Sequence, residues 1–163
     1  MDDRVVLCGG RMVTPDGPKL GEYNVRFGDP ECEVVVPGIE GDIAALLASA
    51  ADGALDPFGV GRARDAAVIV MIASDEPGGG VITGVDEADA LDGVTVFQAR
   101  TARNAVGDLV TAGSGRILGV TGRGHTLGDA RARAYAGVAK INLPGGYHRT
   151  DIAAKAAQES EST

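Results

Sequence analysis

Glycine constrains this chain more than any other residue type. It occupies 25 of 163 positions, about twice its usual level of roughly 7%. Because glycine tolerates left-handed backbone and close backbone approach, many positions are expected to lie in turns, bulges or tight contacts. Aromatic residues make up only 4% and tryptophan is absent, so the core must consist mainly of aliphatic side chains. This scarcity also argues against an aromatic cage or a base-stacking platform.

Charge and hydropathy narrow the class of protein. The apolar fraction of 44% and the net charge of −8 are typical of a folded globular chain. Acidic residues outnumber basic ones by 23 to 15, which argues against binding to a nucleic-acid backbone. Cys8 and Cys32 are too few for a disulfide scaffold, and the sequence shows neither a basic leader nor a long apolar run. These features predict reduced thiols, a cytoplasmic location and no membrane association.

The first part of the sequence predicts a hairpin followed by a short helix. Residues Val5–Thr14 and Pro18–Phe27 flank the turn sequence Pro15-Asp16-Gly17, a pattern typical of two antiparallel strands. Asp29 and Pro30 follow, and their order suits an N-cap and the first residue of a helix.

A second helix is predicted between Ile39 and Ala50. Apolar residues recur there at helical spacing, and Gly53 stands where a C-terminal cap is expected. Residues 53–64 show little periodicity and predict a connection between two structural parts.

The second part predicts a small antiparallel sheet covered by one helix. Apolar runs at Ala66–Ala73, Gly93–Ala99 and Asp108–Thr121 read as strands. Thr126 and Asp129 have the spacing of a capping box, so a helix is expected from Leu127 to Lys140. The polar residues 156–163 predict a disordered tail.

The clearest candidate site is a stretch in which polar and apolar residues alternate without exception. In a strand, Glu22, Asn24 and Arg26 share one face. A carboxylate and an amide oxygen are hard ligands that suit Mg²⁺, and an arginine beside them can hold a phosphate oxygen. Asp29 and Glu31 follow directly, at the expected start of a helix, where free backbone N–H groups would favour binding of an anion. The alternation taken alone favours a solvated outer strand face over a metal site.

Other motifs indicate structural roles. The glycine clusters at 78–80 and 119–124 lack the lysine and hydroxyl residue of a phosphate loop and predict turns and a helix entry. His125 and His148 have no neighbours at metal-ligand spacing. Four arginines predict a solvated helix face, namely Arg123, Arg131, Arg133 and Arg149.

Two stretches resemble the phosphoribosylamine–glycine ligase (glycinamide ribonucleotide synthetase) family. Residues 22–31 read EYNVRFGDPE and are similar to the motif E-[FY]-N-x-R-F-G-D-P-E near the end of the family's ATP-grasp region. Residues 67–155 resemble its C-terminal domain through ITGVDEA, VFQART, RARAYAGVAKI and YHRTDIAAKA. The two matches occur in the order that the family has.

The resemblance implies an ATP-dependent ligase of purine biosynthesis, which joins glycine to 5-phosphoribosylamine through glycyl phosphate. It implies that Glu22 and Asn24 bind Mg²⁺ (or Mn²⁺), with ATP as co-substrate. Arg26 would stabilise the transferring phosphoryl or acyl-phosphate charge. Asp29 and Glu31 would line or shape the substrate cleft.

The family's N-terminal domain and most of its ATP-binding region have no counterpart in this sequence. The resemblance therefore implies catalysis only with a separate chain that supplies those parts. Self-association of the chain through the apolar strand face of Tyr23, Val25 and Phe27 is the alternative expectation for its partner. Glu33, Gln98 and Arg100 stand where the family usually has Gln, His and Gly. A ligase component acting on a different amine or acid, and a non-catalytic regulatory module, scaffold or remnant, are the alternative interpretations.

The predicted fold class is α+β. Residues 1–60 are expected to form a truncated ATP-grasp subdomain with a β-hairpin and helices. Residues 61–155 are expected to form a small antiparallel sheet or partial barrel with one covering helix, and only this second part looks independently complete.

Overall fold

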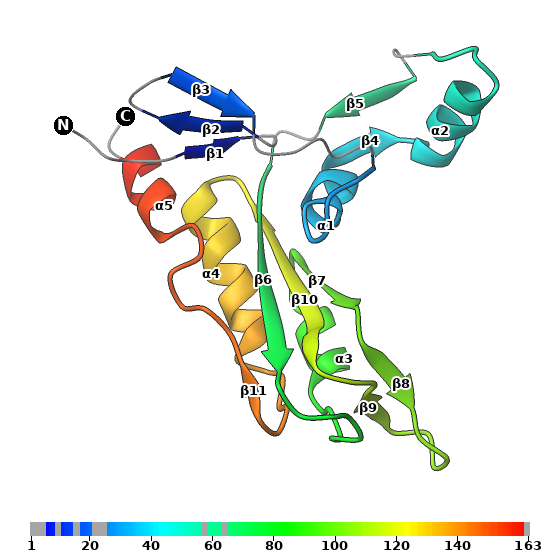
Figure 1. Cartoon of the computed structure of the whole chain (residues 1–163), viewed down its shortest axis with the longest axis vertical. Helices are drawn as coiled ribbons and strands as arrows, with labels where there is room; N and C mark the ends of the chain where they lie inside the picture. Colours follow the sequence, from blue (N-terminus) through cyan, green and yellow to red (C-terminus); the bar gives the residue numbers. More distant parts are fainter. Residues whose placement is uncertain are drawn as a thin grey trace.

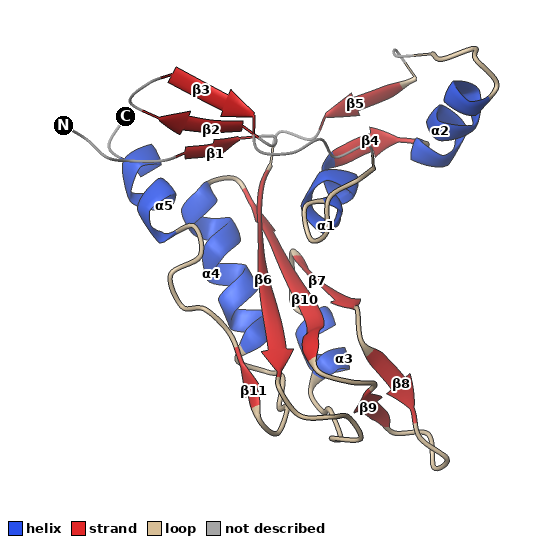
Figure 2. Cartoon of the chain, in the orientation of Figure 1, coloured by secondary structure: helices blue, strands red, loops and turns tan. Residues whose placement is uncertain are grey.

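A computed structural model of the chain describes residues 6–8, 11–14, 17–20, 26–56, 59–62 and 65–161. The described ranges form an α+β structure whose paired strands all run antiparallel, which confirms the predicted fold class (Figures 1 and 2). We call the described residues up to Arg62 the N-terminal segment, and residues 65–161 the C-terminal unit. The predicted domain boundary near residue 60 stays a prediction.

The N-terminal segment opens with three strands. β1 (Val6–Cys8), β2 (Arg11–Thr14) and β3 (Gly17–Leu20) pair in the order β1-β2-β3. The predicted hairpin is therefore part of a three-stranded sheet. The predicted extension of its second strand to Phe27 is wrong at its end, because Arg26 and Phe27 are not in a strand.

The next elements are α1 (Cys32–Val35), a 3₁₀ turn η1 (Val36–Gly38), β4 (Ile39–Gly41), α2 (Ile43–Ala51) and β5 (Val60–Arg62). Asp29 is not the cap of α1, since Glu31 occupies that position without a side-chain cap bond.

The second predicted helix begins later than expected. Gly41 has a φ of +112° and interrupts any helix from Ile39. Asp42 then caps α2 by accepting a hydrogen bond from the Ala45 amide at 2.9 Å. Residues 53–64 are more than a connection, because β5 lies within them and pairs with β4.

The C-terminal unit is built on a four-stranded sheet in the order β11-β6-β10-β7. Its strands are β6 (Ala66–Ser74), β7 (Val94–Gln98), β10 (Gly115–Gly124) and β11 (Gly146–Tyr147). A separate pair joins β8 (Thr101–Arg103) to β9 (Leu109–Thr111). The helices are α3 (Val85–Asp89), α4 (Leu127–Val138) and α5 (Ala154–Glu161).

One face of this sheet packs against α4, as expected for the covering helix (Figure 1). The predicted capping box is present, with Thr126 accepting from the Asp129 amide at 3.0 Å and Asp129 accepting in return. The core consists of aliphatic residues from both layers, which include Val68, Val70, Ile72, Leu118, Val120, Ala130, Ala134 and Val138.

Glycines bring the helix and the sheet together. A Cβ atom on Gly122 would collide with the Ala130 carbonyl and the Ala134 amide of α4. A Cβ atom on Gly137 would lie 2.7 Å from Val120. The cluster at 119–124 thus lies inside β10, and its prediction as turns and a helix entry was wrong.

The prediction of a disordered tail was also wrong for the part of the tail that the structure describes. Residues 154–161 form α5, which packs beside α4 (Figure 1). Ala157 is the buried residue of this helix, so an apolar contact is present although the composition of the tail is mostly polar. None of the helices in the described ranges is long and apolar enough to cross a membrane.

Candidate functional site

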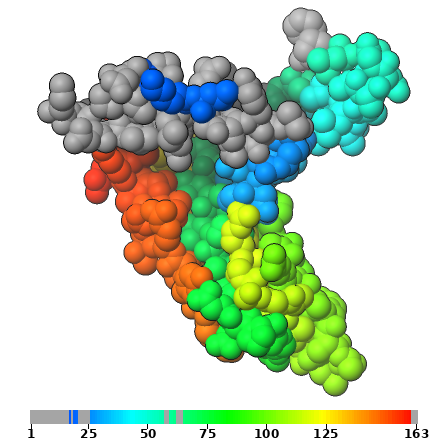
Figure 3. Space-filling model, viewed as in Figure 1, coloured from blue at the N-terminus to red at the C-terminus, as the bar shows by residue number. Residues whose placement is uncertain are grey.

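The sheet face opposite α4 carries the features of a site, and we call it the open face. It presents Ile69, Met71 and Ala73 of β6 beside Gly119 and Thr121 of β10, because alternate residues of a strand share a face. The α1 segment lies on this face and contacts both strands. In Figure 3 the blue α1 segment is seated against the strands of the C-terminal unit.

Two contacts position α1 on the open face. The Thr121 hydroxyl donates a hydrogen bond to the Glu33 carbonyl at 3.0 Å. The Glu33 carboxyl group occupies the space that a side chain on Gly119 would fill, next to Ile69 and Met71. Gly119 therefore makes room for an acidic side chain on a partly apolar surface.

The Glu33 carboxyl group is poorly compensated. Its Oε2 atom is buried and has no hydrogen-bond partner among the described residues. Burial raises the pKa of this carboxyl group above its usual value, the nearby Asp29 charge raises the pKa further, and Arg116 opposes both. Burying a hydrogen-bond acceptor without a donor costs folding free energy, so this atom calls for a physical explanation.

Asp29 links the N-terminal segment to the C-terminal unit. Arg116 of β10 donates to the Asp29 carbonyl at 2.8 Å, and its guanidinium lies 3.2 Å from Oδ1 of Asp29. Both side chains are about half exposed or more, so the ion pair alone contributes at most about 1 kcal/mol.

These residues line a cavity of about 530 Å³, which we call the charged cavity. Its lining residues are Asp29, Glu33, Ala99, Arg100, Gly115 and Arg116. Arg100 donates to the Ser114 carbonyl at 2.8 Å. The turn around it has positive φ angles at Gly113 and Gly115, and a Cβ on either would lie about 4 Å from the guanidinium.

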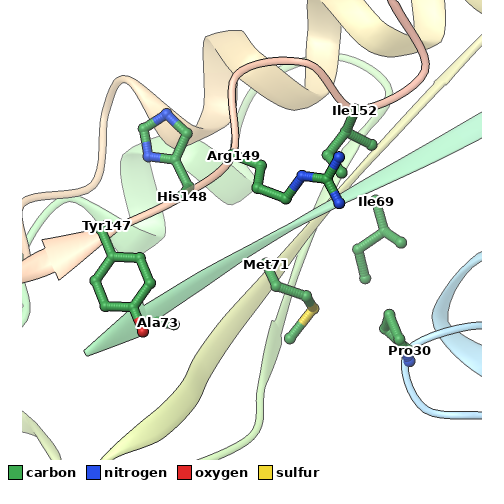
Figure 4. Close-up of a pocket in the computed structure, with 8 residues that line it drawn as sticks. All are labelled: Pro30, Ile69, Met71, Ala73, Tyr147, His148, Arg149 and Ile152. Atoms are coloured by element: carbon green, nitrogen blue, oxygen red, sulfur yellow. The ribbon is translucent and has the colours of Figure 1, made fainter. Parts of the chain in front are cut away.

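A second cavity, of about 280 Å³, is mostly apolar (Figure 4). It is lined by Pro30, Ile69, Met71, Ala73, Tyr147, His148, Arg149 and Ile152. Two of the polar side chains at its rim already have hydrogen-bond partners. Tyr147 donates to Asp75 at 3.0 Å, and Arg149 donates to Asp151 at 2.9 and 2.7 Å.

The predicted metal ligands Glu22 and Asn24 lie outside the described residues. The described ranges contain no group of three or more His, Cys, Asp or Glu residues that could hold a metal ion. Arg26 is exposed and donates to the Phe27 carbonyl at 2.8 Å. The Glu31 carboxylate lies next to Gly28, and Glu31 is not among the residues that line the charged cavity, whereas Asp29 is. The functional roles of all five residues stay predictions.

The sequence did not indicate that Glu33, Arg100 and Arg116 would meet. They are separated by up to 83 positions along the chain, and no short spacing joins them.

Two of the arginines predicted to form a solvated helix face instead make hydrogen bonds to backbone carbonyls. Arg131 donates to the Ile152 and Thr150 carbonyls, and Arg133 donates to the Arg123 carbonyl at 2.8 Å. Arg131 thus connects α4 to the loop before α5, and Arg133 connects α4 to β10.

Comparison with known families gives a direct match. The family model described as "Phosphoribosylglycinamide synthetase, C domain" matches residues 67–155, which is more than half of the chain. A solved structure, the crystal structure of phosphoribosylamine–glycine ligase from Thermotoga maritima, superposes with a TM-score of 0.68 at 30% identity. That match covers 86% of this chain and 35% of the other.

Curated relatives extend the similarity into the N-terminal segment. The chloroplastic phosphoribosylamine–glycine ligase of Arabidopsis thaliana is 42% identical over 164 residues, covering 96% of this chain and 31% of the relative. The phosphoribosylamine–glycine ligase of Mesorhizobium japonicum is 46% identical over 153 residues, covering 90% and 35%. The chain thus spans about a third of the length of the relatives it matches.

Proposed function

Because the chain belongs to the phosphoribosylglycinamide synthetase family, we propose that it contributes the C-terminal part of an ATP-dependent amine–carboxylate ligase. The reaction is the joining of glycine to 5-phosphoribosylamine in purine biosynthesis. One observation carries the proposal: the similarity to the ligases covers 96% of the chain, so it includes the EYNVRFGDPE motif as well as the matched C domain. The proposed location is the cytoplasm.

In this proposal Glu22 and Asn24 hold Mg²⁺ (or Mn²⁺), since a carboxylate and an amide supply the oxygen ligands that such ions prefer. The ion would neutralise phosphate charge of ATP when bound. Arg26 binds anionic charge at the same place. Its exposed side chain is engaged only by a neighbouring carbonyl among the described contacts, so it can turn to a phosphate at small cost. Asp29 and Glu31 shape the adjoining cleft.

The proposed activity needs the parts of the ligase that this chain does not span. We propose that a separate chain or a further part of the same protein supplies the N-terminal and ATP-binding regions. The active site would then form where those regions meet residues 22–31. A chain carrying only the metal-bearing edge is expected to bind nucleotide weakly by itself.

The test is complementation in trans. The chain would be mixed with a polypeptide that carries the N-terminal and ATP-binding parts of a homologous ligase, together with glycine, 5-phosphoribosylamine and Mg-ATP. We expect ligation only in the mixture. Glu22→Gln should reduce the rate at least about 100-fold, because it removes a charged metal ligand. Glu87→Gln, on the exposed start of α3, is the matched control and should leave the rate unchanged.

The same experiment separates the catalytic proposal from its alternative. A regulatory or scaffold module would support complex formation while Glu22→Gln left ligation unchanged. That result, or full activity of the complementing polypeptide without this chain, would refute the catalytic role.

A further inference from the structure

The place that the Glu33 carboxyl group occupies on the open face suits a neutral group better than a charged one. We call this place the Glu33 seat. Its walls are Gly119 of β10 and the side chains of Ile69 and Met71 of β6. The Oε2 atom of Glu33 is buried there and accepts no hydrogen bond from any described residue. Burial without a donor or an opposite charge penalises a carboxylate far more than a protonated carboxyl group.

A better surrounding for the carboxylate lies beside the seat. Glu33 also lines the charged cavity, and so do Arg100 and Arg116. Arg116 already pairs with Asp29, whereas among the described residues no carboxylate forms an ion pair with Arg100. A rotation of the Glu33 side chain from the seat into the cavity would therefore replace apolar walls by water and positive charge.

The charges around Glu33 act in opposite directions. Burial is the largest cause that raises the pKa of its carboxyl group, Asp29 of the same segment raises the pKa further, and Arg116 of β10 lowers it. The other arginine of β10, Arg123, lies 3.4 Å from Asp65. The residues of β6, the second strand that α1 contacts, include no titratable side chain. Ionisation is thus opposed while the carboxyl group stays in the seat.

We propose that Glu33 is a pH-sensitive latch, which holds α1 on the open face when its carboxyl group is protonated and releases α1 when that group is ionised. Because the pKa is raised in the folded state, the latch is fully closed below the unfolded-state pKa of 4.5 and opens as pH rises through the folded-state pKa. The Thr121 bond to the Glu33 carbonyl and the Arg116 bond to the Asp29 carbonyl remain after release. The segment therefore loosens without leaving the sheet.

The latch controls how firmly the end of the EYNVRFGDPE motif is held. α1 begins at Cys32, directly after the last residue of that motif. Asp29 within the motif contacts the same strand, β10, as Glu33 does. A closed latch therefore ties the motif to the C-terminal unit at two places, and an open latch leaves one of them weakened. This inference concerns the docking of α1 and does not rest on the ligase proposal.

Amide hydrogen exchange of the full chain, followed by NMR, measures the state of the latch. The amides of Val35 and Val36 report on α1, because they donate to the Glu31 and Cys32 carbonyls. They also lie beyond the amides of residues 33 and 34, whose intrinsic exchange rates a substitution at residue 33 changes by itself. At each pH the wild-type rate is divided by the rate of the Glu33→Gln variant, so that base catalysis of exchange cancels.

This ratio should be close to one at pH 4 and should rise to about three at pH 7.5, because only the wild type carries a carboxylate that opens the latch. Glu87→Gln, on the exposed start of α3, is the matched control and should give a ratio of one at both pH values. A ratio for Glu33→Gln that is the same at both pH values would overturn the proposal. An equal rise for the α4 amides would overturn it too, since ionisation would then destabilise the whole chain.

Gly119→Ala closes the seat without changing a titratable group. Its methyl group would meet the ends of the Glu33, Ile69 and Met71 side chains rather than backbone atoms, so the sheet should stay folded, with unchanged exchange in α4. With the seat filled, the α1 amides should exchange about threefold faster than in the wild type at pH 4. Adding Glu33→Gln should then produce no pH-dependent difference. If Gly119→Ala leaves α1 exchange and its pH dependence as in the wild type, Glu33 does not act through this seat and the proposal fails.

The exchange measurement and the complementation assay fail independently. Exchange is measured on this chain alone, without ATP, metal ion or a complementing polypeptide. Ligation in the mixture without a pH-dependent ratio would leave the ligase proposal standing and remove the latch. A pH-dependent ratio without ligation would do the reverse.

Discussion

The N-terminal segment and the C-terminal unit differ in how they are stabilised. In the C-terminal unit a helix and a sheet enclose a core of fully buried aliphatic side chains. In the N-terminal segment, none of the described side chains is fully buried, and apolar residues such as Leu20, Phe27 and Leu47 are about half exposed. Secondary structure without a core depends on outside contacts. From this difference we expect the C-terminal unit to fold alone and the described side chains of the N-terminal segment to depend on a surface to pack on.

A matched pair of leucine truncations tests most directly whether the two regions differ in core packing. Leu118→Ala in β10 removes a side chain with 0% exposure and should lower the free energy of unfolding by about 3 kcal/mol. Leu47→Ala in α2 removes one that is 47% exposed and should change it by less than about 0.5 kcal/mol. Urea unfolding of both variants measures the difference. Equal losses would show that the segment has a core of its own.

A matched pair of glycine substitutions is expected to have the next largest effect. Gly122→Ala places a methyl group against the backbone of α4 and should destabilise the chain by about 2 kcal/mol. Gly38→Ala in η1 meets nothing within 4 Å and requires no positive φ, so its effect should stay below about 0.5 kcal/mol. Thermal unfolding compares them. An unaffected Gly122→Ala variant would mean that α4 does not sit on the sheet as closely as described.

The same contrast explains what the sequence could predict. The strand from Ala66, the strand from Val94 and the helix from Leu127 were predicted because each buries one regular face and the helix carries its own capping box. The glycines at which α4 packs closely on the sheet were not predicted. In a sequence, a glycine that allows such close packing cannot be told from a glycine in a turn. The helix α5 was missed because its one buried alanine, Ala157, stands among polar residues.

The candidate site was predicted only where its residues are neighbours in the chain. Asp29 was singled out within the EYNVRFGDPE motif, but its partner Arg116 is 87 positions away. Glu33 and Arg100 were each noticed as departures from a family pattern, with no indication that they share a cavity. Long-range pairing of this kind is set by the topology of the sheet and by α1 on its open face.

At the junction of the two regions, Glu33→Gln should stabilise the chain at neutral pH. The pKa of the carboxyl group is raised in the folded state, so its ionisation opposes folding. Wild-type stability should therefore fall as pH rises through that raised pKa. The advantage of the variant should stay below about 1 kcal/mol at pH 7, because solvent screens a carboxyl group that is only partly buried, and it should vanish below the unfolded-state pKa of 4.5. Urea unfolding between pH 4 and pH 8 measures this, with Glu87→Gln as a control.

A pH-independent difference between the Glu33 variant and the wild type would contradict this account. It would mean that the carboxyl group finds a donor in solution and that its ionisation is not opposed.

The smallest expected effect concerns the ion pair that joins the two regions. Asp29→Asn removes the charge facing Arg116 but keeps the Asp29 carbonyl, which accepts the shorter bond at 2.8 Å. Since both side chains are largely solvated, global stability should change by less than about 0.5 kcal/mol, and less still in high salt. Hydrogen exchange of the α1 amides is the more sensitive measurement, because only local docking depends on the pair. Faster exchange in α1 with unchanged exchange in α4 would support a docking role for Asp29, whereas uniform acceleration would mean that the two regions unfold as one.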